Sequence, residues 1–369
     1  MQKLNITQNE IKKILIFKLC CFGDIIFLTP TISALKKNFP DAEISLIASP
    51  WIAALKNHLK YVEDVIIFND VFEKNFFKKA IGTLSLIRVL KKKNFDLVFM
   101  GHRKSIFGLI VKLSGIKYRL GFKETKFLNL TETFDPSIHE TERYLNVLKV
   151  NGLNTVDNKI ELIQNKSKDE INENNNIERG KFIIGIFPFG GTNPGTEMDI
   201  KRWDIEKYYS LINKLTKDSK DHLILLFEGK HINEKLTKKD FAGNVMVKSI
   251  DIDLISICDI LVCGDTGPLY IADALEVSTI ALFGPSDPRL VAPIDYPERK
   301  NLHQYIWKKP DCSPCYTPTT SIDKRNRKYW NGNNFICNTG THECMKEITV
   351  DEVFSKLNEM IIKIKKSNE

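Results

Sequence analysis

The chain has 369 residues, of which 43% are hydrophobic and 27% are charged, and its formal net charge at pH 7 is +8. This length exceeds what one ordinary hydrophobic core serves, so we expect two domains of similar size. Lys18 and Asp24 interrupt the first apolar stretch, and no later run reaches the roughly 18 residues that a membrane span needs. The sequence therefore excludes a signal peptide or a span and favours a cytoplasmic location.

The charge is distributed unevenly between the two halves. Residues 1–170 hold 27 Lys/Arg and 18 Asp/Glu, a net charge of +9, whereas the remainder holds 27 and 28, a net charge of −1. A basic half favours an anionic partner, such as a phosphate-bearing lipid surface or a nucleic acid. Solvated helix faces in a lysine-rich protein are the alternative.

Short apolar, β-branched runs alternate with helical patterns along the chain. In the first half, we expect strands at 14–19, 44–48, 65–68 and 96–100, and helices at 25–39 and 79–92. The stretch 164–180, QNKSKDEINENNNIERG, has almost no apolar residues and indicates a surface linker. In the second half, we expect strands at 182–187, 223–227, 245–247, 260–263 and 279–283, and helices at 205–215, 269–275 and 350–365.

This alternation predicts an α/β fold made of two doubly wound, Rossmann-like domains that face a cleft. The domains are expected to span 1–170 and 181–346. A C-terminal helix over 347–369 follows, with packing back on the N-terminal domain as one arrangement open to it. Ligands of open α/β folds bind outside the carboxyl ends of the strands, so the loops there are the candidate sites.

The first such loop holds a single glycine, Gly23, followed by Asp24. A nicotinamide dehydrogenase would carry G-x-G-x-x-G after its first strand, so its absence argues against that class.

Two loops in the second half are candidates for binding a diphosphate. In one, a strand ends in Gly190, Gly191 and Thr192, and Lys201 and Arg202 come shortly before the next helix. Backbone amides, the threonine hydroxyl and the lysine ammonium could hold a diphosphate together, although no Walker pattern is present. Solvated basic residues ahead of a helix are the alternative.

In the other loop, Gly264–Gly267 lie between a buried strand and a helix that opens near Pro268. The N–H groups and dipole of that helix make an anion site at Thr266 and Gly267. A plain capped turn, with Asp265 satisfying backbone donors, is the alternative.

Four late cysteines are spaced as C-x2-C, a 21-residue gap and C-x6-C: Cys312, Cys315, Cys337 and Cys344. The spacing is too wide for a standard zinc ribbon, so a structural zinc site and reduced packing thiols both stay open. No thiolate-activating partner is near, which argues against a catalytic role.

Four pieces of sequence together resemble the ADP-heptose:lipopolysaccharide heptosyltransferase family (glycosyltransferase family 9), and they lie in the family's order. They are Gly23–Asp24 with IIFLTPTISALKKNFPDAEI, the loop Lys201–Arg202–Trp203, GDTGPLYIADALEVSTIALFGPSDP, and CSPCY…HECM. The third piece is the most specific, and the resemblance covers most of the chain.

The resemblance implies the GT-B architecture, with the nucleotide-sugar on the C-terminal domain and the acceptor on the N-terminal domain. The implied reaction transfers a heptose from ADP-heptose, with inversion, to the lipopolysaccharide inner core (a lipid A–Kdo or heptosyl acceptor). No divalent metal or other cofactor is then required for catalysis.

Roles follow for residues of this sequence. Asp24 becomes the base for the acceptor hydroxyl, Gly23 keeps its approach open, and Lys201 neutralises the departing diphosphate. The remaining residues implied to bind the donor are Gly190, Gly191, Thr192, Glu234, Asp265, Thr266, Gly267 and Tyr270.

One departure concerns Tyr270, where the family usually has histidine. Another nucleotide-sugar, or an O-antigen or capsule acceptor, is therefore the alternative. A non-catalytic nucleotide-binding or nucleic-acid-binding protein is a remote one, because no RNA-binding or helix-turn-helix pattern is visible.

The basic N-terminal half fits an anionic glycolipid acceptor, with the enzyme peripherally associated with the cytoplasmic side of the inner membrane. Arg103 and Lys104 are expected to bind the acceptor, and no nucleic acid is expected as a partner. Further basic residues for that surface are Lys56, Lys60, Lys74, Lys78, Lys79, Lys91, Lys92, Lys93 and His102. The segment EKNFFKKAIGTLSLIRVLKKK fits interfacial docking, with a helix simply packed on the sheet as the alternative.

Overall fold

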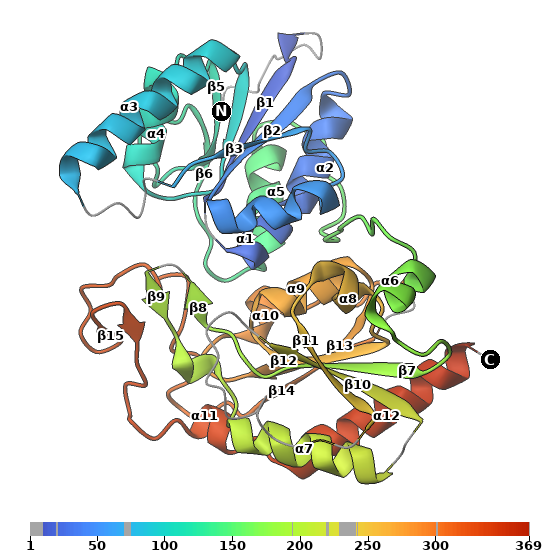
Figure 1. Ribbon diagram of the computed structural model, residues 1–369. Helices are drawn as coiled ribbons and strands as arrows, with labels where there is room; N and C mark the ends of the chain where they lie inside the picture. The colour runs from blue at the N-terminus through green and yellow to red at the C-terminus, as the bar shows by residue number, and fades with distance from the viewer. Residues whose placement is uncertain are drawn as a thin grey trace. The chain divides into compact units, whose positions relative to one another are not determined.

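The computed structural model describes residues 10–19, 21–69, 75–193, 195–218, 221–228, 241, 243–299 and 302–368. The chain divides into two compact units, Met1–Ile163 (unit 1) and Gln164–Glu369 (unit 2), and each is described by itself (Figure 1). Both predicted doubly wound α/β domains are confirmed.

Unit 1 contains a six-stranded parallel sheet with the order β3-β2-β1-β4-β5-β6. Its strands are β1 (Lys13–Phe17), β2 (Glu43–Ala48), β3 (Asp64–Ile67), β4 (Leu97–Met100), β5 (Tyr118–Phe122) and β6 (Leu130–Glu132). The chain moves outward from β1 to β3 and then returns to the other side of β1 as β4. Between β1 and β4 lies the topological switch point, where such sheets bind ligands.

Helices cover both faces of this sheet, which explains why β1, β2 and β4 are nearly continuous apolar runs. They are α1 (Phe22–Ile26), α2 (Thr29–Asn38), a 3-10 helix (Pro50–His58), α3 (Phe76–Lys93), α4 (Ser105–Leu113) and α5 (Glu140–Val150). Helices α3 and α4 pack together on one face, and α2 and α5 on the other (Figure 1).

The helix predicted over 25–39 is two helices. A turn at Phe27 and Leu28 separates α1 from α2, and Pro30 lies in the first turn of α2, where its missing N–H costs no hydrogen bond. Asp24 is thereby held on a separate short helix beside the end of β1.

Unit 2 repeats the same topology with a parallel sheet in the order β11-β10-β7-β12-β13-β14. Its strands are β7 (Phe182–Phe187), β10 (His222–Glu228), β11 (Val245–Ser249), β12 (Ile260–Gly264), β13 (Ser278–Phe283) and β14 (His303–Trp307). The switch point lies between β7 and β12. A small second sheet joins β8 (Thr192–Asn193), β9 (Thr196–Glu197), β15 (Trp330–Asn331) and β16 (Asn334–Phe335).

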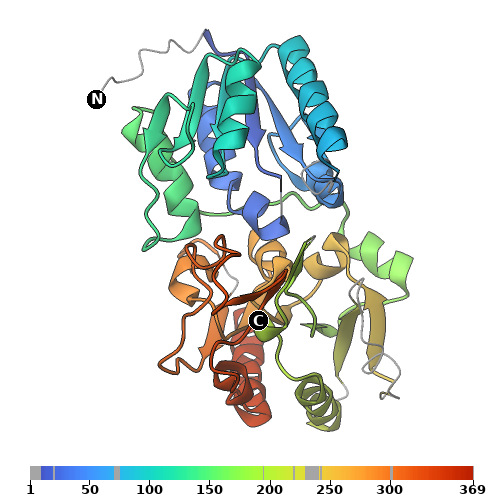
Figure 2. The same cartoon turned by 90° about the vertical axis from the view of Figure 1, so that its left-hand side faces the viewer.

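The helices of unit 2 are α6 (Lys168–Asn175), α7 (Ile205–Asp218), α8 (Ile252–Ser256), α9 (Gly267–Ala274), α10 (Pro288–Val291), α11 (Glu343–Lys346) and α12 (Val350–Asn368). The apolar stripe of α12, including Val353, Leu357 and Met360, packs on α7 and the sheet of its own unit. Figure 2 shows this helix, drawn in red, beside other elements of unit 2, and its packing on the N-terminal domain stays a prediction.

The polar stretch 164–180, predicted to be a linker, contains helix α6. The Ser167 side chain caps the start of α6 by accepting from the Glu170 N–H at 3.2 Å. Ile171 is buried within unit 2, and α6 packs on α8. One apolar residue per helical face is too weak a periodic signal to predict such a helix. No helix in the described residues combines the length and hydropathy that crossing a membrane requires.

Candidate functional site

At the switch point of unit 1, Asp24 lies in the first turn of α1, directly after the end of β1. Its carboxylate oxygen Oδ2 is 3.6 Å from Lys18 Nζ; the side chain of Asp24 is 32% exposed and that of Lys18 only 9%. The buried ammonium faces the carboxylate, and partial exposure lets a substrate hydroxyl reach it. This geometry suits a general base.

Lys18 is fixed by a buried network that extends away from Asp24. Its ammonium donates to the Gly101 carbonyl at 3.0 Å and to the Tyr144 hydroxyl at 2.9 Å, and Tyr144 donates to Glu140 Oε1 at 2.6 Å. Burial, followed by the negative charge of Glu140, raises the pKa of Tyr144 well above its ordinary value, so the phenol stays protonated and can donate. Glu140 also pairs with the buried Arg143.

In the sequence, Lys18 is recognisable only as an interruption of an apolar run. Its signal was a lysine at the end of an otherwise buried strand, because a buried cation needs fixed partners. Those partners, the residue that follows β4 and a tyrosine of α5, cannot be inferred from the local sequence around Lys18.

The loop after β4 lies beside the loop after β1. The backbone N–H of Leu19 donates to His102 Nε2 at 2.8 Å. Burial, and then the charges of Lys18 and Lys104, hold the pKa of His102 well below its usual value. His102 is thus a neutral acceptor that joins the two loops, which corrects its inclusion among the basic surface residues.

The predicted acceptor residues are near this loop. Arg103 lies with its guanidinium carbon 3.8 Å from the centre of the Phe134 ring, and burial lowers its pKa. Lys104 is exposed at the start of α4, while Gly23 is buried in α1. The structure thus brings Gly23, Asp24, Arg103 and Lys104 to one end of the sheet, and their contacts with an acceptor stay a prediction.

At the switch point of unit 2, Asp265 follows β12 and is buried. One carboxylate oxygen accepts from Lys201 Nζ at 2.6 Å, and the other accepts from the Tyr270 hydroxyl at 2.5 Å. Burial alone would raise the pKa of Asp265, but the charge of Lys201 and hydrogen bonds from Lys201 and Tyr270 hold it below its ordinary value. Asp265 therefore positions both partners.

Lys201 reaches Asp265 from a short 3-10 helix (Asp199–Lys201) that follows the β8–β9 hairpin. Its ammonium also lies 4.3 Å from the centre of the Tyr316 ring, and its side chain is only 10% exposed. An ammonium carries three N–H donors, and in the described residues Asp265 accepts one of them. To bind a diphosphate as predicted, Lys201 would donate one of its other two N–H groups.

The glycine loop after β7 is shaped by Arg202, which sequence reasoning left out of the site. Arg202 donates to the Gly190 carbonyl and to the Thr192 hydroxyl, both at 2.7 Å, and its guanidinium pairs with Glu197. Gly191 has φ of +72°, and an added Cβ would lie 2.3 Å from a backbone oxygen, so only glycine fits there.

This loop also contacts the turn after β12. A Cβ added at Gly190 would lie 2.7 Å from Thr266 Oγ1, so the two predicted donor loops touch. Thr266 is the N-cap residue of α9, and in the described part of the chain its hydroxyl makes no capping bond. The structure thus brings together Gly190, Thr266 and Gly267. Glu234, the predicted ribose-binding residue, lies outside the described residues.

The four late cysteines lie near one another. Burial, followed by the neighbouring thiols of Cys312 and Cys337, raises the pKa of Cys315 to about 11. Burial and the other three thiols likewise raise the pKa of Cys344 to about 12. No three His, Cys, Asp or Glu side chains in the described ranges meet in an arrangement that would hold a metal ion. The zinc site stays a prediction.

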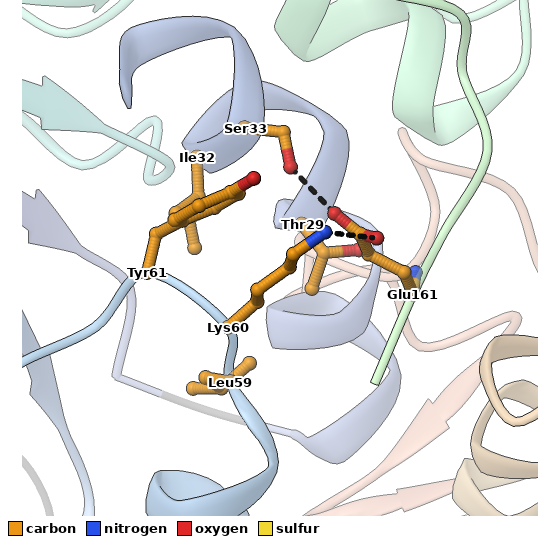
Figure 3. A pocket seen from close by; sticks show the side chains of 7 residues that line it. All are labelled: Thr29, Ile32, Ser33, Leu59, Lys60, Tyr61 and Glu161. Carbon is orange, nitrogen blue, oxygen red and sulfur yellow. Dashed lines mark hydrogen bonds and ion pairs between the residues drawn. The ribbon is translucent and has the colours of Figure 1, made fainter. Parts of the chain in front are cut away.

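A separate pocket of about 190 Å³, open solvent included, lies beside α2 in unit 1 (Figure 3). Glu161 accepts from the Ser33 hydroxyl at 2.7 Å, its N–H donates to Thr29 Oγ1 at 3.1 Å, and Lys60 Nζ is 3.6 Å from its carboxylate. These contacts hold the segment at Glu161 against α2. None of the predicted catalytic residues lines the pocket.

Comparisons with known proteins agree on one family. The model of glycosyltransferase family 9 (heptosyltransferase) matches residues 83–325. Lipooligosaccharide heptosyltransferase 2 from Campylobacter jejuni subsp. jejuni serotype O:2 is 23% identical over 356 residues, covering 92% of this chain and 95% of that protein.

Two solved structures from Escherichia coli have the same fold. ADP-heptose LPS heptosyltransferase II gives a TM-score of 0.69 at 18% identity, with 97% of this chain and 100% of that chain covered. Heptosyltransferase WaaC with ADP-2-deoxy-2-fluoro heptose gives 0.65 at 17% identity, with 94% and 99% covered. The family match begins after Asp24, so the role of Asp24 depends on the local geometry and the sequence resemblance.

Proposed function

The chain belongs to glycosyltransferase family 9 (heptosyltransferase), and we propose that it transfers a heptose from ADP-heptose to the inner core of a lipopolysaccharide, with inversion. The names of its relatives support heptose as the transferred sugar, and the ADP-heptose analogue on WaaC supports ADP-heptose as the donor. The observation that carries the catalytic part is the partly exposed Asp24 carboxylate beside the buried Lys18.

The reaction is an in-line displacement at the anomeric carbon. The acceptor hydroxyl oxygen bonds to that carbon while the bond to the diphosphate oxygen breaks. Asp24 takes the hydroxyl proton, and Lys18 compensates its charge before the transfer. The diphosphate departs as ADP with the electrons of the broken bond.

Unit 2 supplies the groups that stabilise the departing diphosphate. The N-terminal N–H groups of α9 at Thr266 and Gly267 and the ammonium of Lys201 offer preorganised positive charge. Asp265 fixes Lys201 in place, and the glycine loop lets the diphosphate approach the backbone.

The acceptor in this proposal is an anionic glycolipid, and the enzyme works at the cytoplasmic face of the inner membrane. The excess of Lys and Arg in residues 1–170 supports this partner.

The test is a transfer assay with ADP-heptose and purified inner-core acceptor. Asp24→Asn, which keeps the size of the side chain, should lower kcat by about 10²–10⁴-fold while calorimetry gives an unchanged affinity for ADP. Substantial activity in this variant would remove Asp24 as the base.

Tyr270 supports a second candidate, a transferase of the same family with another nucleotide-sugar. Its hydroxyl is bound to Asp265 rather than offered to the donor. Calorimetry with ADP, UDP and GDP separates the candidates, because the proposed function requires preference for ADP.

A further inference from the structure

Helix α3 presents an exposed stripe that is apolar in its first half and basic in its second. Phe77, Ile81 and Leu84 are 75%, 67% and 53% exposed, and Arg88 and Lys91, also exposed, continue the stripe. The steps of four, three, four and three residues place all five side chains on one face of the helix. Large apolar side chains so exposed on one face mark an interaction surface.

This face is directed away from the core of unit 1. Leu86 and Leu90, on the opposite side of α3, are buried and pack with the sheet and with α4. The Asn75 side chain fixes the start of the helix by accepting from the Lys78 N–H at 3.1 Å, and Asn94 ends it in a left-handed conformation. The exposed stripe is therefore presented by a capped helix that is packed on its other side.

Helix α4 extends the apolar surface. Ile106 and Leu113, which are seven residues apart and so lie on one face of α4, are each more than half exposed. Helices α3 and α4 pack side by side (Figure 1). The segment 75–126, which carries both helices, holds 13 Lys/Arg and two Asp/Glu.

We propose that the exposed faces of α3 and α4 dock unit 1 on an anionic lipid bilayer. Apolar side chains enter the boundary between headgroups and acyl chains, while lysines and arginines contact lipid phosphates. A second copy of the chain fits less well, because a symmetric dimer would place this basic surface against itself. The inference deepens the proposed function, since it states how a lipid-anchored acceptor is reached, but bilayer binding itself needs neither donor nor acceptor.

The test is co-sedimentation of the purified protein with vesicles made of three parts phosphatidylcholine to one part phosphatidylglycerol, and with vesicles of phosphatidylcholine alone. We expect binding to the anionic vesicles that weakens with salt. Ile81→Ser with Leu84→Ser should weaken it about tenfold or more through lost apolar burial. Lys91→Gln with Lys92→Gln should weaken it by about fivefold for each charge removed.

Matched controls come from α12 in unit 2, which carries Ile362, as exposed as Leu84 of α3, and two exposed lysines. Ile362→Ser, and Lys363→Gln with Lys366→Gln, should leave vesicle binding unchanged. The lysine variants of α3 keep the test valid if the apolar ones fail to fold.

Absent binding, or binding that both α3 variants and the α12 controls affect equally, overturns the proposal. So does a dimer in solution that Ile81→Ser dissolves, because the surface would then belong to a second copy. ADP affinity measured on the same preparations separates the two ideas. ADP binding without vesicle binding refutes only the docking surface, and vesicle binding without ADP binding refutes only the proposed function.

Discussion

Asp265→Asn tests the organisation of the donor site through protein stability. The change keeps the shape of the side chain but removes the charge that compensates Lys201, whose side chain is 10% exposed. Breaking a buried ion pair by removing one partner costs about 3–5 kcal/mol. A unit of this size loses about 2–4 °C in Tm for each kcal/mol, so the unfolding transition of unit 2 should fall by about 6–20 °C.

Asp265→Leu with Lys201→Met is the matched control, because replacing both charges by apolar groups leaves neither one buried alone. We expect most of the lost stability to return, whereas ADP binding stays impaired. Differential scanning calorimetry and ADP titrations give the two readouts. A single variant as stable as the parent protein, or a double variant less stable than the single one, would refute a buried, mutually dependent pair.

The same pair has a pH signature. The pKa of Asp265 is lower in the folded protein than its ordinary value, so its contribution to stability is present in full above that ordinary value. It is lost as the pH falls through the lowered pKa of the folded state. The difference in unfolding free energy between the parent protein and Asp265→Asn should therefore be constant near neutral pH and shrink below about pH 4.

Three further outcomes are expected. Lys18→Met should lower kcat by about tenfold or more, because it removes the cation 3.6 Å from the Asp24 carboxylate, with unchanged ADP affinity, and unchanged kcat would contradict its role beside Asp24. Gly191→Ala should abolish ADP binding or folding of unit 2, whereas Gly152→Ala, at a similar positive φ but with open space around it, should cost only about 1–2 kcal/mol in urea unfolding. Metal analysis should find no stoichiometric zinc, because no three ligand side chains meet in the described ranges, whereas about one zinc ion per chain that Cys312→Ser with Cys337→Ser removes would contradict this expectation and establish the zinc site.

The fold was predictable because both sheets are buried on two faces. Their central strands, such as Phe182–Phe187, are apolar runs bounded by turns, and this pattern is visible locally. Elements of mixed polarity were harder to predict from the sequence. Strand β14 carries His303 and Gln304, and α6 owes its place to Ile171, so neither has the periodicity that sequence reasoning needs.

The candidate site was predictable at the level of loops but not of partnerships. Asp24 follows a strand of unit 1, and Gly190 and Thr266 follow strands of unit 2. Within each unit, the parallel topology brings such loops to one end of the sheet whatever their residues. The contacts between individual side chains depend on residues that are far apart in sequence. Lys201 and Asp265 are 64 residues apart, and the sequence near Asp265 does not indicate that its carboxylate pairs with a lysine.

The two switch points use the same pair of residue types in opposite ways. In unit 1 the lysine is buried and tied to Gly101 and Tyr144, so the carboxylate of Asp24 is the member of the pair that solvent reaches. In unit 2 the carboxylate of Asp265 is buried and both its oxygens are occupied, so its function is to hold a cation in place. Proton acceptance requires an accessible base, whereas stabilisation of a departing diphosphate requires a fixed positive charge. One topology thus exposes a carboxylate in one unit and buries a carboxylate that fixes a lysine in the other, because the partners of each lysine decide which member of the pair is exposed.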